Sequence, residues 1–563
     1  MKKSPPYTVG SYLAKRLEEI GANDYFTVPG DFNLVLLDEF LKNKKLRLVS
    51  CCNELNAGYA ADGYARRKGI GVTVTTFCVG SLSQINAIAG AYAEDIPVIA
   101  ISGGPNTNSE KDHEVVHHSL GGVPTGYVRE MFAHVTASAI RVTDPKKAPA
   151  QIDEAILACL QLKKPVYIEV ACNIANETCA APQPLRLAKR PTQNKTKLEH
   201  VVKLVAAKLA LAKKPMLVAG VKLRRSCADG AFLDFVDKSG YAFAMMPNAK
   251  GLVPETHKGY IGTYWGAISS PGVKEAVEFS DAVLFVGTTF TDYTTCGHTM
   301  LLSKEWLIRV DPDSVTVNGV THEGIEMCQF LTALRHKVAF NSGSLDQFCQ
   351  TYVKPELEKK IHSTKKLLRK HLFSQVESLL DESDVVIAET GDSWFNCLDL
   401  DLPKGCGFEI QMQFGSIGWS VGATLGAAIA DHKKRRIVTF VGDGSFQLTA
   451  QEISTMVRYG LNPIIFVINN SGYTIEVEIH DGPYNQVQDW NYAQIMHVFN
   501  GKDGKGWSQR VATEGALADA IKIAHRNTGP SLIEVMLDPD DCSRELLEFG
   551  NFVAAHNKRP FVS

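Results

Sequence analysis

The sequence predicts an α/β protein of three domains, each with a mainly parallel sheet flanked by helices. The chain has 563 residues, which at typical domain sizes is enough for about three domains. Its 45% content of hydrophobic residues is ample for buried cores. Short apolar runs alternate with helical stretches along the chain, which is the pattern of a parallel sheet covered on both faces.

The first predicted domain covers residues 1–188. Leu13, Leu17 and Ile20 form a helical stripe that Gly21 ends. A second helical stretch is expected over 56–66. The expected strands, each a short apolar run, are 25–28, 46–51, 72–77, 96–102 and 166–170. The polar, basic segment 183–198 carries two prolines and is typical of a linker.

A middle domain, 195–350, and a third domain, 360–563, repeat the alternation. The strands expected in the middle domain are 216–219, 282–286 and 307–310. The turn at Gly220 lacks the pattern G-x-G-x-x-G, so we expect no dinucleotide site there. The strands expected in the third domain are 385–389, 437–441, 463–468 and 531–535.

Charge and composition exclude several classes of partner. The net charge of −2 gives no reason to expect nucleic acid or an anionic membrane. No apolar run approaches the roughly 18–20 residues that span a bilayer, and no secretory signal is apparent after Met1. The 13 cysteines are scattered, and we expect adjacent Cys51 and Cys52 to be a buried thiol pair in a reducing cytosol. The sequence therefore predicts a cytoplasmic protein.

The most informative motif is the turn Gly442-Asp443-Gly444, which follows an apolar strand and precedes a helical stretch. Such a turn points backbone N–H groups at an anion such as a diphosphate. A second strand ends at Asn469-Asn470. Asp443 and Asn470, at the carboxyl ends of neighbouring strands, can supply two oxygen ligands to Mg²⁺. A lone Gly-Asp-Gly is common, but the whole unit predicts a site for magnesium and a diphosphate.

Seven motifs, in this order, resemble those of the pyruvate decarboxylase family of thiamine diphosphate (ThDP)-dependent enzymes over essentially the whole chain. They are Val28-Pro29-Gly30-Asp31, Cys52-Asn53-Glu54-Leu55-Asn56, His117-His118, Glu389 to Phe395, Gly415 to Trp419, the Gly442 to Asn470 unit, and Gly472 to Glu476. The resemblance implies a ThDP-binding fold at both ends of the chain. The first domain would bind the pyrimidine ring, the middle one would be Rossmann-like, and the last would bind the diphosphate and carry a closing C-terminal segment.

The resemblance also implies a role for each site residue. Glu54 would hydrogen-bond the pyrimidine ring and promote removal of the thiazolium C2 proton. Ile417 would force the two rings into a V, and the Gly415 carbonyl would bind the exocyclic amino group. The proton-transfer group would consist of Asp31, His117, His118 and Glu476. The metal ligands would be Asp443, Asn470 and the Gly472 carbonyl. Further cofactor contacts would be Thr390, Asp392, Ser416, Gly444, Ser445, Tyr473, Thr474 and Ile475.

Substrate size is inferred from two bulky residues. Trp394 and Ile475 match the pocket residues of pyruvate-specific members of the family, and Tyr293 would line the same pocket, together with Asp31, His118 and Glu476. The chain departs from common family residues at four positions that bear on the width and closure of the pocket, namely Phe414, Ser471, Phe549 and Asn551.

Each of these residues also has an ordinary structural interpretation. Glu54 and Glu476 could be helix-start carboxylates, and Asp31 could be a turn residue. The paired histidines could lie on the surface, and the bulky pocket residues could be core residues. Their positions inside matched motifs favour the functional interpretation.

The resemblance implies a homodimer or homotetramer with active sites at the subunit interface. It would convert pyruvate to acetaldehyde and CO₂ non-oxidatively, through a ThDP ylid and an enamine. The alternative substrates are larger 2-oxo acids, namely indolepyruvate, phenylpyruvate or branched-chain acids. A carboligating enzyme of the acetolactate synthase type is disfavoured because paired histidines suit protonation and release. A catalytically silent ThDP-binding subunit is disfavoured by the intact site residues. Substrate-activated fungal relatives carry a regulatory cysteine soon after the first strand of the middle domain. Because 216–221 contains no cysteine here and Cys227 falls several residues later, the resemblance implies hyperbolic kinetics with pyruvate.

Overall fold

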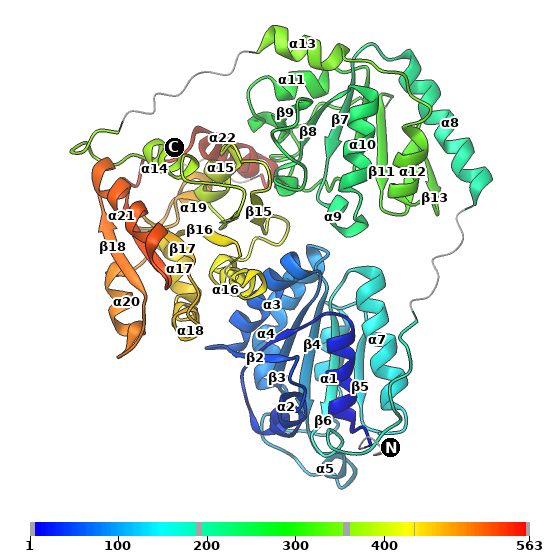
Figure 1. Ribbon diagram of the computed structural model, residues 1–563, viewed down its shortest axis with the longest axis vertical. Helices are drawn as coiled ribbons and strands as arrows, with labels where there is room; N and C mark the ends of the chain where they lie inside the picture. Colours follow the sequence, from blue (N-terminus) through cyan, green and yellow to red (C-terminus); the bar gives the residue numbers. More distant parts are fainter. Residues whose placement is uncertain (1–5, 187–193, 304, 353–360, 433, 559–563) are drawn as a thin grey trace.

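The computed structural model describes residues 6–186, 194–303, 305–352, 361–432 and 434–558. Within these residues the strands form three sheets, each flanked by helices (Figure 1). This arrangement confirms the predicted α/β class. The predicted linker 183–198 lies partly outside the described residues.

The N-terminal sheet is entirely parallel and has the strand order β2-β1-β3-β4-β6-β5. Its strands are β1 (Asp24–Thr27), β2 (Arg47–Ser50), β3 (Gly71–Thr76), β4 (Val98–Gly104), β5 (Ala139–Val142) and β6 (Val166–Ala171). The helices of this region are α1 (Val9–Glu19), α2 (Leu34–Leu41), α3 (Glu54–Lys68), α4 (Val79–Ala93), α5 (Thr107–Lys111), α6 (Tyr127–Ala133) and α7 (Ala148–Leu162).

The middle sheet is mixed, in the order β13-β12-β11-β10-β7-β8-β9, because β12 runs antiparallel to both of its neighbours. Its strands are β7 (Pro215–Ala219), β8 (Ala242–Met245), β9 (Tyr260–Thr263), β10 (Ala282–Val286), β11 (Leu307–Asp311), β12 (Ser314–Val317) and β13 (Val320–Glu323). Its helices are α8 (Lys195–Leu211), α9 (Lys222–Ser226), α10 (Asp229–Ser239), α11 (Val273–Glu278), α12 (Met327–Leu334) and α13 (Gly343–Thr351).

The C-terminal sheet is again entirely parallel, in the order β15-β14-β16-β17-β19-β18. Its strands are β14 (Asp384–Ala388), β15 (Gly407–Ile410), β16 (Arg436–Gly442), β17 (Ile464–Asn469), β18 (Trp507–Val511) and β19 (Ser531–Met536). Its helices are α14 (Arg369–Glu377), α15 (Asp392–Leu398), α16 (Trp419–Asp431), α17 (Asp443–Thr449), α18 (Glu452–Arg458), α19 (Thr474–Ile479), α20 (Tyr492–Asn500), α21 (Glu514–Arg526) and α22 (Arg544–His556).

Every strand that the sequence predicted is present, with ends shifted by a few residues. The prediction missed β5, β8, β9, β12, β13, β15 and β18. Most of these lie at or next to a sheet edge, where strands are short and only partly buried, as in β13 and β18. A partly exposed strand lacks the continuous apolar run on which the prediction depended.

The N-terminal and C-terminal domains share one hydrophobic core, in which α3 packs against α16 (Figure 1). The helices approach closely because small residues face each other. A methyl group built on Gly426 would lie 1.8 Å from the Ala60 carbonyl oxygen, so only glycine fits there. Arg66 lies over the Trp419 ring at 4.7 Å and pairs with Asp62 at 2.5 Å. Among the described residues, none of the helices combines the length and apolar character that a bilayer crossing needs.

Candidate active site

The Gly-Asp-Gly turn places Asp443 at the start of α17, directly after β16. β16 pairs with β17, so Asp443 and Asn470 emerge at the same end of neighbouring strands, as the sequence predicted. Asp443 is 1% exposed. Its Oδ1 accepts a hydrogen bond from Gly444 N (2.7 Å) and its Oδ2 accepts one from Gly472 N (3.2 Å). Burial raises the pKa of this carboxyl to about 6, even though backbone donors lower it.

The surroundings of Asp443 fit a bound cation. Asn470 donates its Nδ2 to Thr474 Oγ1 at 2.5 Å, which leaves the side-chain carbonyl oxygen of Asn470 available as a ligand. A methyl group built on Gly444 would lie 2.4 Å from the Tyr473 ring, so the turn needs glycine to pack there. A buried carboxylate beside an amide oxygen is a donor set suited to Mg²⁺, which also takes phosphate oxygens as ligands.

Glu389 fixes the loop that contains Gly415 and Ile417. It follows β14 and is fully buried. Its Oε2 accepts hydrogen bonds from Gly418 N (3.1 Å), Ser420 N (3.0 Å) and Ser420 Oγ (2.7 Å). Its Oε1 accepts one from Thr390 N (2.8 Å). Burial raises the pKa of Glu389. Glu389 lies inside one of the seven motifs, but the sequence predicts no role for it. Most of its hydrogen-bond partners lie about 30 residues further along the chain.

Two other predicted cofactor residues have contacts in the same region. Ser416 accepts a hydrogen bond from Asn86 Nδ2 (3.2 Å), which joins this loop to α4 of the N-terminal domain. Asp392 accepts a hydrogen bond from Ser543 N at 3.2 Å and a short one from Ser543 Oγ. Asp392 therefore docks the start of α22 onto α15, and burial raises its pKa.

Aromatic side chains form one wall beside Gly415. Trp394 is fully buried, and its ring meets the ring of Tyr293 edge-on with centroids 5.9 Å apart. Tyr293 also meets Phe549 of α22 at 5.5 Å. A methyl group built on Gly415 would lie 3.7 Å from Trp394 and 3.9 Å from Tyr293. Ile475 belongs to the same hydrophobic cluster. Of the three predicted pocket residues, Tyr293 and Trp394 are therefore in contact beside Gly415, and Ile475 belongs to the same extended hydrophobic cluster.

The N-terminal domain carries the predicted histidines and Asp31. His117 Nε2 lies 2.5 Å from Asp31 Oδ2, and His118 Nε2 lies 3.7 Å from Asp31 Oδ1. Phe32 stacks on the His117 ring with centroids 4.8 Å apart. All three polar side chains are exposed. The segment before them contains the short helix α5.

Arg141 anchors the segment that leads to the histidines. It donates to Glu110 Oε2 of α5 (2.7 Å) and to Thr125 Oγ1 (2.9 Å), and it pairs with Glu169 Oε1 of β6 (2.7 Å). Burial raises the pKa of Glu169 to about 7. Burial also acts to raise the pKa of Glu110, but its bonds from Thr125 and Arg141 lower it overall. The sequence contains no local pattern that predicts these contacts of Arg141, because they join residues far apart in the chain.

Glu54 occupies the first turn of α3, which Asn53 caps. A methyl group built on Gly80 would lie 2.9 Å from Glu54 Oε1 and 3.2 Å from Thr76. A methyl group built on Gly30 would lie 2.6 Å from the same Thr76 side chain. Thr76 therefore lies between Glu54 and the segment that carries Asp31, at the carboxyl end of the internal strand β3.

The predicted residues form two groups, one on the N-terminal domain and one on the C-terminal domain. Among the described residues, no hydrogen bond or ion pair joins Glu54, Asp31 or the two histidines to the group of Asp443, Asn470 and Glu476. Figure 1 shows α5 at the bottom of the N-terminal domain and α19 within the C-terminal domain. Glu476, in the first turn of α19, is exposed.

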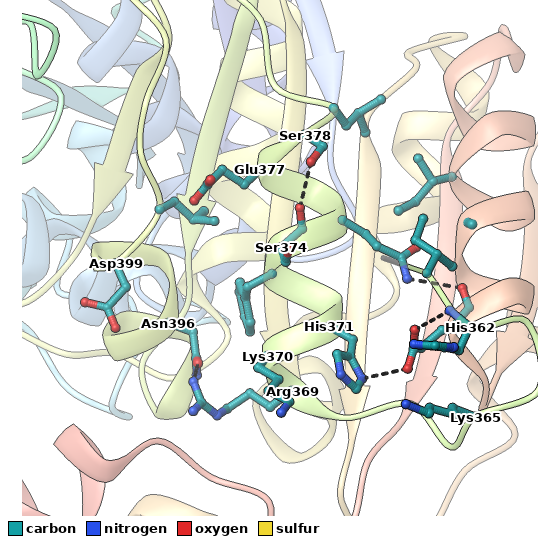
Figure 2. Close-up of a pocket in the computed structure, with 18 of the residues that line it drawn as sticks. His362, Lys365, Arg369, Lys370, His371, Ser374, Glu377, Ser378, Asn396 and Asp399 are labelled. Carbon is teal, nitrogen blue, oxygen red and sulfur yellow. Dashed lines mark hydrogen bonds and ion pairs between the residues drawn. The ribbon is translucent and has the colours of Figure 1, made fainter. Parts of the chain in front are cut away.

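A cavity of about 600 Å³ between α14 and α21 contains none of the predicted site residues (Figure 2). Basic side chains, including Lys365, Arg369 and Lys370, gather at one end, and Glu377 lies at the other. The buried Glu514 carboxylate pairs with His371 Nδ1 at 3.3 Å.

Three family models match the chain. They are the N-terminal TPP binding domain, the central domain and the C-terminal TPP binding domain of thiamine pyrophosphate enzymes, over residues 7–131, 202–334 and 400–535. The chain is 49% identical over 560 residues to pyruvate decarboxylase 1 of Pisum sativum, covering 98% of this chain and 94% of that protein. It is 48% identical over 560 residues to pyruvate decarboxylase 1 of Arabidopsis thaliana, covering 98% and 92%. Pyruvate decarboxylase 2 of Oryza sativa subsp. indica is 48% identical over 561 residues, again covering 98% and 92%.

Proposed function

This chain belongs to the family of thiamine pyrophosphate enzymes, and from that premise we propose that it decarboxylates pyruvate non-oxidatively to acetaldehyde and CO₂. Sequence identity of 48–49% to plant pyruvate decarboxylases along nearly the whole chain supports pyruvate as the substrate. The geometric observation that carries the proposal is the Asp31–His117–His118 group, which suits proton delivery and product release.

ThDP and Mg²⁺ are the cofactors of this enzyme. Asp443, Asn470 and the Gly472 carbonyl would hold the metal, and the N–H groups around Gly444 and Ser445 would face the diphosphate. ThDP supplies an electron sink for the electron pair left when CO₂ departs. Glu389 keeps the loop with Gly415 and Ile417 in place, so that the loop can orient the two rings.

The remaining residues bind the substrate and move protons. Glu54 would hold a proton at its carboxyl group against the pyrimidine ring. Asp31 Oδ2 and His117 Nε2, 2.5 Å apart, can share one proton, and His118 Nε2 lies near the other Asp31 oxygen. These groups would supply the proton that replaces CO₂ and accept the proton released with the aldehyde.

Trp394, Tyr293 and Ile475 would close the pocket behind the methyl group of pyruvate. Two bulky rings in contact, Trp394 and Tyr293, would disfavour the longer side chains of indolepyruvate or phenylpyruvate. CO₂ release should be measured with a panel of 2-oxo acids, with and without added ThDP. Preference for phenylpyruvate or indolepyruvate over pyruvate would replace this proposal by that of a large-substrate decarboxylase.

We further propose a homodimer or homotetramer whose active sites combine the N-terminal group of one subunit with the C-terminal group of another. The placement of the two groups on different domains, with no hydrogen bond or ion pair between them among the described residues, supports this arrangement. Inactive Glu54→Gln and inactive Glu476→Gln chains should regain part of the activity when mixed and allowed to exchange subunits. No recovery despite demonstrated exchange would place complete sites within single chains.

Two further assignments remain proposals. The domain boundaries are 1–188, 195–350 and 360–563, and positions 188 and 360 lie outside the described residues. A cytoplasmic location is supported by the 13 free cysteines, although Cys51 is only partly buried and Cys52 is exposed rather than buried as expected. Fractionation of cells that express the full chain would test the location.

A further inference from the structure

A cluster in the N-terminal domain, made of Asp31, His117 and His118, contains the carboxylate and imidazole groups that are typical ligands of a transition-metal ion. Asp31 follows β1, and His117 and His118 come from the segment after α5. One ligand atom from each residue lies within 4.8 Å of the other two. We propose that this Asp-His-His cluster binds a zinc ion, or a similar transition-metal ion, and that the bound ion inhibits the enzyme.

The distances between the ligand atoms are such that a small movement of the side chains would let them bind a tetrahedral ion. Zinc binds imidazole nitrogen and carboxylate oxygen at about 2.0–2.2 Å, so its tetrahedral ligands lie roughly 3.3–3.5 Å apart. The two nitrogen–oxygen separations in the cluster, 2.5 Å from His117 Nε2 to Asp31 Oδ2 and 3.7 Å from His118 Nε2 to Asp31 Oδ1, lie on either side of that range. Three protein ligands leave a fourth position for water or substrate. Imidazole favours zinc over Mg²⁺, which prefers oxygen ligands, so the cofactor's own metal should not occupy this cluster.

Neighbouring groups hold the ligands before any ion arrives. Phe32 stacks on the His117 ring at an interplanar angle of 13° and meets the His118 ring edge-on at 6.1 Å. The two imidazole centroids are 4.6 Å apart. His118 has φ of +57°, a left-handed conformation that is uncommon for residues other than glycine. A surrounding structure that fixes such a residue reduces the ordering that binding would otherwise require.

Solvent reaches the cluster, since the side chains of His117, His118 and Asp31 are 60%, 38% and 49% exposed. Zinc would occupy the nitrogen lone pairs and the carboxylate oxygen that otherwise accept and donate protons. Proton delivery to the substrate would then stop. The inhibition rests on the proposed function, whereas the binding of zinc does not.

The test is a calorimetric titration with Zn²⁺ of protein saturated with ThDP and excess Mg²⁺. We expect one zinc per chain that excess Mg²⁺ does not displace. Removing an outer-sphere partner typically weakens metal binding by about 10–100-fold, so the loss of a direct ligand in Asp31→Asn, His117→Gln or His118→Gln should weaken it by at least about tenfold. His113→Asn is the matched control, because His113 lies in the same segment, also has positive φ and is outside the cluster.

Wild type and His113→Asn should both lose CO₂ release as zinc is added and regain it with a chelator already loaded with Mg²⁺. Unchanged zinc affinity in all three ligand variants would overturn the proposal and direct attention to the cysteines. Displacement of zinc by excess Mg²⁺ would also overturn it, by placing the ion at Asp443. Zinc bound to the cluster without loss of CO₂ release would overturn the inhibitory role. Zinc binding by a protein that releases no CO₂ even without zinc would instead contradict the proposed function.

Discussion

The N-terminal and C-terminal sheets have the same strand order but differ in the residues at their strand ends. In each sheet the second strand along the chain lies at one edge, and the fifth lies at the other. The C-terminal sheet places a buried carboxylate, Asp443, between glycines. The N-terminal sheet places Asp31 and two histidines in an exposed cluster. One scaffold thus serves two tasks, because holding a metal and a diphosphate needs fixed oxygen and N–H groups, whereas moving protons needs groups that substrate can reach.

The comparison can be tested most strongly at Glu54, the N-terminal residue expected to act directly on the cofactor. Glu54→Gln should keep folding and most ThDP binding but slow exchange of the cofactor's C2 proton by roughly 10²–10⁴-fold, since Gln cannot transfer a proton. Exchange is measured by NMR after quenching in deuterated buffer, with calorimetry to check binding. Exchange at the wild-type rate would remove Glu54 from this role.

The C-terminal half should respond in the opposite way. Asp443→Ala should weaken Mg²⁺ and ThDP binding together, by on the order of 100-fold, because the carboxylate is a proposed direct ligand. Calorimetry with ThDP at fixed Mg²⁺ measures the effect. Asp384→Asn is the control, since Asp384 is also buried in the C-terminal sheet but begins β14, away from the strand ends that carry the site. Equal losses in both variants would mean that general destabilisation, and not metal binding, explains the result.

A smaller effect is expected at Arg141, which holds in place the segment that leads to His117 and His118. Arg141→Met removes the link between α5 and β6 and should lower kcat by about tenfold through misplacement of His117 and His118. ThDP affinity should stay nearly unchanged, because the diphosphate and metal site on the other sheet should contribute most of it and Arg141 is not among the predicted cofactor contacts. Arg141→Lys retains one charge and should recover part of the activity. A loss of ThDP affinity that parallels the loss of kcat would show that Arg141 supports the fold as a whole.

Sequence reasoning found the buried strands, the Gly-Asp-Gly turn and the candidate residues because each depends on local pattern or on a matched motif. The pairing of β16 with β17, which brings Asp443 and Asn470 to one edge, followed from the parallel-sheet prediction. The roles of Glu389 and Arg141 did not follow. Glu389 binds N–H groups about 30 residues away, and Arg141 joins two carboxylates from different elements. Such contacts are set by tertiary packing, and a single sequence carries no signal for them.

The smallest expected effect is a pH dependence at Glu169, the buried end of the Arg141 clamp. Burial raises the folded-state pKa of Glu169 to about 7, whereas an unperturbed Glu has a pKa near about 4.3. Between these values the folded state holds a proton that the unfolded state has lost, so this group's contribution to stability falls as pH rises through the interval and is constant above it. Glu169→Gln removes the titration. The difference in melting temperature, variant minus wild type, should therefore move upward between pH 5 and pH 8. Calorimetric scans of both proteins at matched salt and scan rate measure it. A difference that stays constant with pH would mean that Arg141 keeps Glu169 ionised throughout.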